Sequence, residues 1–301
     1  MNDIFITAFS IPALIILPMV IAIICFVAGK STLSRIISMI SSMALVAICA
    51  LQAGSVLQQG APIELIIGGW QPPLGIKLSI NAFSAIMLLM TSIIGLAITL
   101  YSTHYFENDD KEARFWPLWW LLITALNGVF ISSDIFNTYI MLELLGLTAV
   151  SLIAIQGTQQ ALQASFQYLL VGLFGSLMYL LGVAIIYRTY GVLDNQLIAN
   201  LVESNLSMQL ALALITLGMM MKCALFPLHF WLPSAHSNAS APVSAMLSAL
   251  VVKAAFFILF NFWFEILTPV VTTTAVTILG VFGAMAVIYG SYRAFTSPRL
   301  K

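Results

Sequence analysis

Uninterrupted apolar runs, each long enough to cross a lipid bilayer, follow one another along almost the whole chain. Only 7% of the 301 residues are charged, whereas soluble domains carry about 25%. A spanning α-helix needs about 20 apolar residues. The runs lack the alternation of apolar and polar residues that marks a membrane β-barrel. The sequence therefore predicts an all-α, polytopic transmembrane helix bundle.

About nine spans are expected, with the seventh interrupted. They cover residues 5–29, 33–54, 81–102, 115–131, 135–156, 162–187, 209–231, 241–264 and 270–292. The region 55–80 carries glycines and prolines between short β-prone pieces, which predicts an interfacial hairpin with Trp70 at headgroup level; an irregular loop is an equal alternative. The segment THYFENDDKEAR is expected to be a solvated loop, and Asp134 is expected to cap the fifth span.

Lysine and arginine in the short loops predict the orientation, because cytoplasmic loops carry an excess of these residues. With the N-terminus outside, seven lie on the cytoplasmic side and two on the outer side. These sets are Lys30, Arg35, Lys111, Arg114, Arg293, Arg299 and Lys301, against Lys77 and Arg188. We therefore expect a multi-pass protein with its N-terminus outside and its C-terminus in the cytoplasm.

Three ionisable residues, Glu143, Lys222 and Lys253, lie inside predicted spans. At about 1.5 Å per residue they sit roughly 12, 20 and 18 Å into their helices, in the middle third of a core about 30 Å thick. Charges at that depth usually face a protein interior or water. Burial favours a neutral lysine and a nearby carboxylate favours a charged one, so the set is suited to gaining and losing protons. A static ion pair is the alternative, but it leaves one lysine uncompensated.

The stretch MKCALFPLHFWLP places Pro227 five residues after Lys222. Proline lacks an N–H and crowds the carbonyl four residues back, so the helix is expected to kink or break at Cys223. Broken membrane helices are tolerated where they line a cavity, which predicts water beside Lys222. A kink that serves packing alone is the alternative.

Two histidines follow this proline. His229 comes seven residues after the lysine, on the same face of a continuous helix, and is a candidate proton relay or a hydrogen-bonded anchor. His236 is expected in the loop before the eighth span, at a candidate cytoplasmic entrance. Ser240, Ser244 and Ser248 recur every four residues, which indicates close helix packing or, alternatively, a wetted path.

The sequence carries no signature of a catalytic or cofactor site. It has no phosphate-binding loop, dinucleotide fingerprint, metal-ligand cluster or nucleophile triad. The three cysteines lie in apolar runs, and two or more of them are expected to be core thiols. Formal net charge is zero and no basic block occurs, so nucleic acid is not an expected partner. We expect no bound cofactor, no metal and no redox centre in this chain, whether or not its complex is an oxidoreductase.

Three stretches together resemble the proton-translocating membrane subunits shared by Mrp-type cation/proton antiporters, above all their D-type component, and respiratory complex I. They are GGWQPPLGIKLSINAFSAIML (68–88), SDIFNTYIMLELLGL (133–147) and KCALFPLHFWLPSAHSNASAPVSAMLSALVVKAAF (222–256). The resemblance covers most of the chain from about residue 68 onward. It implies a fold of two five-helix bundles related as inverted repeats, each with a broken helix, of which this chain holds the first.

The resemblance also implies roles for residues and regions. The coupled glutamate and lysine of the family are matched by Glu143 and Lys222, and Lys253 continues the route. The implied regions are three spans with the hairpin over 1–114, a five-helix proton-channel bundle over 115–265, and the start of a second bundle over 266–301.

The chain departs from the family pattern in three places. Asn81 stands where an aspartate is frequent, Ser240 stands where a proline is common, and the sequence stops at SPRLK, where the second bundle is expected to begin.

The resemblance implies a subunit of a bacterial-type inner (plasma) membrane that translocates protons, with sodium as a second candidate ion. Its expected partners are the lipid bilayer and the other membrane subunits of an Mrp-type antiporter or of an NADH:quinone oxidoreductase or hydrogenase-like complex. A truncated, non-conducting structural subunit is the alternative. A transporter of an organic solute is a third candidate, but it would need a sizeable polar pocket at the midplane.

Overall fold

The computed structural model of the chain describes residues 2–29, 32–106 and 109–297. Lys30, Arg299 and Lys301, which count toward the expected cytoplasmic excess of charge, lie outside the described residues. The elements in chain order are α1 Asn2–Ala28, α2 Thr32–Gln59, β1 Ile63–Ile66, η1 Ile67–Gly69, β2 Lys77–Ile80, α3 Ala82–Tyr105, α4 Asp109–Ile131, α5 Ile135–Ala154, α6 Gln159–Tyr190, α7 Asn195–Leu201, α8 Leu206–Lys222, α9 Leu232–Asn238, α10 Ala241–Met246, η2 Leu247–Val251, α11 Val252–Asn261, η3 Phe262–Ile266, η4 Thr268–Val270 and α12 Thr273–Thr296.

Among the described residues, eight helical segments are long and apolar enough to cross a membrane. They match eight of the nine expected spans, and the run Ala241–Ile266 continues from α10 through α11 with two π-helical turns. The remaining expected span, 209–231, is represented by α8, which is apolar but only 17 residues long. The all-helical, polytopic bundle expected from the sequence is therefore confirmed, with a discontinuous seventh span.

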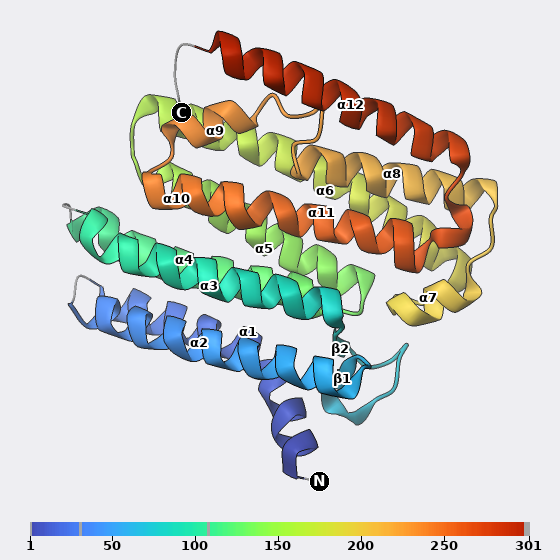
Figure 1. The fold of residues 1–301 in the computed structure, drawn as a ribbon, viewed down its shortest axis with the longest axis horizontal. Helices are drawn as coiled ribbons and strands as arrows, with labels where there is room; N and C mark the ends of the chain where they lie inside the picture. Colours follow the sequence, from blue (N-terminus) through green and yellow to red (C-terminus); the bar gives the residue numbers. More distant parts are fainter. Residues whose placement is uncertain (1, 30–31, 107–108, 298–301) are drawn as a thin grey trace.

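The helices run side by side in layers (Figure 1). α1 and α2 form one face and pack on α3 and α4, α5 lies against both α4 and α6, and α8 lies against α6 and α11. α12 lies outermost and buries none of its residues against the described chain. The hairpin and α7 lie at one end of the bundle, and α9 lies at the other.

The glycine- and proline-rich region 55–80 contains a short antiparallel hairpin. Ile63 in β1 faces Ile80 in β2, and Ile66 faces Lys77. Trp70, in the connection between the strands, is 67% exposed. β2 continues this pairing through Leu78 to a residue in the turn before α5, so the hairpin is anchored to the end of the bundle.

A buried lysine anchors the same end electrostatically. Lys77 Nζ lies 3.4 Å from Asp194 Oδ2 and 3.5 Å from Glu64 Oε1, and it donates to Gln196 Oε1 at 2.7 Å. Asp194 also caps α7 by accepting from two backbone N–H groups. Since Asp194 and Asp134 pair through their backbones, the hairpin, α7 and the start of α5 form one connected cap.

Asp134 caps α5, as expected. Its carboxylate accepts from the backbone N–H groups of Phe136 and Asn137 at 2.8 and 2.7 Å. Burial raises the pKa of the Asp134 carboxyl above 3.8, and the charge of Asp194 adds to the rise, whereas the two backbone hydrogen bonds oppose it.

We predict that Asp134→Asn changes the pH dependence of stability in acid. A carboxyl whose pKa is higher in the folded state keeps its proton longer there, so its contribution to stability falls as the pH rises from 3.8 through the raised pKa. Asparagine retains the capping oxygen but does not titrate. Thermal unfolding in acidic buffers should show wild-type stability, relative to Asp134→Asn, falling across this window. A relative stability that rises there contradicts the prediction, and exposed Glu203→Gln is the control.

The expected solvated loop at THYFENDDKEAR is wrong at both ends, because α3 continues to Tyr105 with Thr103 buried. α4 begins at Asp109, and Glu112 is buried. Its two carboxylate oxygens accept from the guanidinium of Arg35 at 2.5 Å each, and Trp116 Nε1 donates to it at 3.0 Å. Arg35 lies 77 residues earlier, on α2, so the segment's own composition did not reveal the partner that allows this carboxylate to be buried.

Candidate functional site

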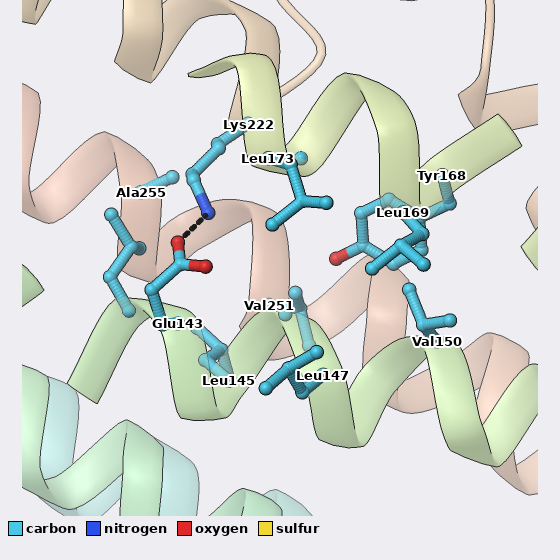
Figure 2. Close-up of a pocket in the computed structure, with 13 residues that line it drawn as sticks. Glu143, Leu145, Leu147, Val150, Tyr168, Leu169, Leu173, Lys222, Val251 and Ala255 are labelled. Atoms are coloured by element: carbon cyan, nitrogen blue, oxygen red, sulfur yellow. Dashed lines mark hydrogen bonds and ion pairs between the residues drawn. The ribbon is translucent and has the colours of Figure 1, made fainter. Parts of the chain in front are cut away.

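Glu143 and Lys222 meet in the interior of the bundle. Glu143 lies on α5, Lys222 is the last residue of α8, and Lys222 Nζ lies 3.3 Å from Glu143 Oε1 (Figure 2). The lysine side chain is 8% exposed and the glutamate side chain 22%. Ser176, on α6, donates its hydroxyl to the same glutamate oxygen. Three helices therefore converge on one carboxylate.

A close approach of α6 and α8 seats the lysine. A Cβ on Gly218 would lie 2.4 Å from the backbone oxygen of Gly175, and a Cβ on Gly175 would lie 2.9 Å from the backbone oxygen of Gly218. The Gly175 Cβ would also come within 3.3 Å of Lys222 Cγ. Two glycines thus bring the helix backbones close enough for the lysine stem to lie along α6, with its ammonium directed at α5.

A small cavity adjoins the ion pair. Glu143 and Lys222 supply its charged groups, and apolar side chains such as Leu173, Val251 and Ala255 supply much of the rest of its wall (Figure 2). The centre of a water molecule can occupy a volume of about 20 Å³ within this cavity. Since one water needs about 10–15 Å³ by this measure, the cavity has room for one water beside the pair.

The helix that carries Lys222 ends where the sequence predicts a break. Cys223 is the C-cap of α8, and a helix resumes only at Leu232. The expected span 209–231 is therefore wrong in its extent. Pro227 lies within the irregular segment, five residues beyond Lys222, the last residue of α8.

Backbone carbonyls near the end of α8 accept hydrogen bonds from groups of the chain itself. Met220 O accepts from the N–H of Leu225 at 2.9 Å, and Met221 O accepts from Trp231 Nε1 at 3.0 Å. The Trp231 ring stacks on Tyr168 of α6, with centroids 4.2 Å apart. A backbone N–H and an indole N–H thus satisfy two carbonyls at the end of α8, and the indole joins this end of the helix to α6.

Lys253 does not join the pair in this structure. Its side chain is exposed, and Nζ donates to the backbone oxygen of Ser248. Val251 and Ala255, two residues to either side, line the cavity instead. Residues two apart on a helix project in different directions, so Lys253 points away from the cavity that its neighbours face.

The two histidines lie in settings different from those expected. The irregular segment cancels the helical spacing that placed His229 on the face of Lys222. The His229 ring instead lies against Phe226 and Tyr289, at centroid distances of 5.7 and 5.2 Å. His236 lies in α9 rather than in a loop, and its Nδ1 shares a hydrogen bond with Ser244 Oγ at 3.0 Å.

Sequence reasoning missed a set of buried polar side chains on α2, α3 and α4. Ser34, Ser38 and Ser42 recur every four residues on α2, and all are buried. This spacing is the same signal that drew attention to Ser240, Ser244 and Ser248, and it was present in the sequence. The facing set on α3 and α4 includes Thr91, Ser92, Thr99, Thr124 and Asn127.

Two family models match the chain. The model described as NADH:quinone oxidoreductase/Mrp antiporter, TM matches residues 132–301, and the model described as NADH-Ubiquinone oxidoreductase (complex I), chain 5 N-terminus matches residues 69–116. The first model covers more than half of the chain and includes the elements that carry Glu143 and Lys222.

Curated relatives agree with these models. NADH-quinone oxidoreductase subunit N of Desulforudis audaxviator is 32% identical over 269 residues, which are 86% of this chain and 53% of that protein. The D component of the Na(+)/H(+) antiporter of Alkalihalophilus pseudofirmus is 29% identical over 248 residues, which are 80% of this chain and 50% of that protein. The chain therefore spans about half the length of the curated relatives it matches.

Solved structures share the fold. A chain of the membrane-bound sulfane sulfur reductase, an archaeal respiratory membrane complex, superimposes with a TM-score of 0.83 at 30% identity, over 89% of this chain and 56% of the other. A chain of the Mrp complex from Dietzia gives a TM-score of 0.78 at 25% identity, over 85% of this chain and 48% of the other. These relatives are subunits of multisubunit membrane complexes. Taken with the family models, they show that this chain belongs to the family of proton-antiporter membrane subunits shared by NADH:quinone oxidoreductase and Mrp antiporters.

Proposed function

We propose that this chain moves protons within a multisubunit membrane complex, and that the Glu143–Lys222 pair is its proton-handling element. The observation that carries the proposal is a buried ammonium, 3.3 Å from a carboxylate, at the end of a helix that stops beside a water-sized cavity. A buried charge of either sign is costly without its partner, so the protonation states of the two groups are coupled.

The proton cycle follows from this coupling. With Glu143 ionised and close, Lys222 keeps its proton. When the carboxylate moves away or takes a proton, the buried ammonium loses its compensating charge and releases a proton to water in the cavity. Ser176 donates to the same carboxylate oxygen as the lysine, so its hydroxyl can hold the glutamate while the ammonium is absent. The lysine then takes a new proton when the carboxylate returns ionised.

Three further residues extend the proton route beyond the ion pair. Lys253 follows on α11, next to the cavity-lining residues Val251, the last residue of η2, and Ala255 of α11. His229 and His236 lie on the stretch from the helix break toward α10, and we assign them to the entrance from the cytoplasmic side. Protons enter there if the N-terminus lies outside, as the loop charges predict.

Three regions of the chain have different roles. Residues 115–265 form the proton-channel bundle, 1–114 support it together with the hairpin, and 266–301 lead into a second bundle. The partners are further membrane subunits of an Mrp-type antiporter or a respiratory complex, as for the relatives. Sodium is a candidate counter-ion in the antiporter case, since matched relatives belong to Na(+)/H(+) antiporters.

Proton flux in the reconstituted complex tests the proposal. Glu143→Gln keeps the shape of the side chain but cannot ionise, so flux should fall to background. Glu64→Gln, which removes a half-exposed carboxylate at the far end of the bundle, is the matched control and should conduct as wild type. Wild-type flux in Glu143→Gln would overturn the proposal and favour a purely structural subunit.

A further inference from the structure

A second buried polar region lies in the bundle of α1 to α4, apart from the ion pair. Trp119 Nε1 and Ser42 Oγ both donate to Thr99 Oγ1, at 3.1 Å each. Trp120 Nε1 donates to Ser38 Oγ at 2.9 Å. These contacts tie α2, α3 and α4 together through hydroxyl groups in the interior of spanning helices.

One hydroxyl of this region lacks a partner. Thr91 is fully buried on α3, and its Oγ1 makes no hydrogen bond to any described residue. Threonine hydroxyls inside helices commonly donate to a carbonyl one turn back, as Thr124 does to Trp120 O at 2.9 Å. A buried hydroxyl without a hydrogen-bond partner is unfavourable. A small molecule that can both accept and donate hydrogen bonds would satisfy the Thr91 hydroxyl.

A cavity lies where that ligand would sit. Thr91, Ser92 and Ser42 line it, together with Trp119 and Trp120. The centre of a water molecule can occupy a volume of about 10 Å³ within this cavity. One water needs about 10–15 Å³, so the cavity fits a single water and nothing larger.

Two hydroxyl oxygens around the cavity are free to accept a hydrogen bond. The Ser42 proton is used on Thr99, and the Ser92 proton is used on Leu89 O at 2.9 Å, so both oxygens keep lone pairs to accept a hydrogen bond. A water that accepts from Thr91 and donates to Ser42 and Ser92 makes three hydrogen bonds. Three is the number that buried waters typically make.

We propose that this cavity is a water-binding site, and that one ordered water joins Thr91 and Ser92 of α3 to Ser42 of α2. The water completes the hydroxyl contacts among α2, α3 and α4. It gives the N-terminal helices a hydrated polar core that is separate from the cavity at Glu143 and Lys222. The inference does not depend on proton movement through the chain.

Radiolytic hydroxyl labelling of the complete protein in its membrane complex tests the site, because radicals formed from trapped water oxidise the side chains that touch it. Trp119 and Trp120 are buried and are expected to be oxidised in wild-type protein. Thr91→Val removes the hydroxyl with little change of shape, and labelling of both tryptophans should fall to background. Thr91→Ser keeps the oxygen and should label as wild type.

Thr124→Val is the matched control, because its hydroxyl lies in the same bundle but serves only its own helix. It should leave the labelling of Trp119 and Trp120 unchanged, and exposed Trp70 reports equal dose in every sample. Equal labelling of the two buried tryptophans in wild type and folded Thr91→Val overturns the proposal. If Thr91→Val does not fold, a map of the wild-type complex decides: density within hydrogen-bonding distance of Thr91 Oγ1 supports the site, and a well-resolved empty cavity refutes it.

Discussion

Lys222→Met is expected to abolish proton flux and to lower the free energy of unfolding by about 3–5 kcal/mol, the cost typical of removing one partner of a buried ion pair. The loss of stability arises from the glutamate that remains. Glu143 is 22% exposed and would keep the hydroxyl of Ser176 as a hydrogen-bond donor but would have no cation beside it. Methionine fills the space of the lysine stem, so the comparison isolates the charge.

The double variant Lys222→Met/Glu143→Gln separates the structural role of the pair from its role in transfer. With both charges absent, no buried charge is left alone, so stability should return close to wild type. Flux should stay at background, because neither group can carry a proton. Unfolding in detergent and flux in proteoliposomes measure the two effects on the same preparations, and Arg188→Met, an exposed cation at the end of α6, is the control. A double variant that conducts as wild type would remove the pair from the pathway.

The helices were predictable because the reason for them is local. Each apolar run must satisfy its own backbone hydrogen bonds in lipid, and a helix does this without help from distant residues. The break at Cys223 was predictable for a similar reason, since the steric effect of Pro227 acts four residues back. The Glu143–Lys222 contact was predictable because an unpaired charge inside the bilayer costs free energy. Charges on two predicted spans were therefore expected to pair with each other or to contact water.

The course of the chain beyond the break was not predictable in the same way. It depends on Trp231, which donates to Met221 O and stacks on Tyr168. Those partners lie on α8 and α6, and no local pattern indicates that an indole will meet them. Helical spacing therefore failed at His229, and a proline- and serine-rich stretch that suggested a loop around His236 forms a short helix instead.

Burial of polar groups far from the main site was also missed, for a physical reason. An acidic segment is normally solvated, and Glu112 is buried only because Arg35 reaches it from another helix. The serines of α2 are individually unremarkable in an apolar span. They can be recognised as a buried polar set only when hydroxyl and indole N–H groups of α3 and α4 are seen to contact the same region, as those of Thr99 and Trp119 do.

Gly218→Val is expected to destabilise the protein and to reduce proton flux strongly. Its Cβ would lie 2.4 Å from the backbone oxygen of Gly175 and 3.0 Å from the backbone nitrogen of Tyr179. Backbone atoms cannot swing aside as a side chain can, so α8 must move away from α6. Overpacking a tight interior costs about 1–3 kcal/mol, and contact with two backbone atoms points to the upper part of that range.

The loss of flux follows from where Gly218 lies on α8. Lys222 is one turn further along the same face, so a displacement of the helix at Gly218 carries the ammonium away from Glu143. Gly54→Ala on α2 is the control: nothing lies within 4 Å of its Cβ, and it lies on a helix that carries neither Glu143 nor Lys222, so stability and flux should be kept. Gly182→Val gives a comparison at the same interface, because its Cβ meets Ile215 Cγ1 at 2.6 Å and the backbone oxygen of Ala211 at 2.9 Å, two to three turns before Lys222. It should reduce stability while keeping more of the flux than Gly218→Val. Equal loss of flux in the two variants would mean that transfer depends on the integrity of the whole interface rather than on the distance between the lysine and the glutamate.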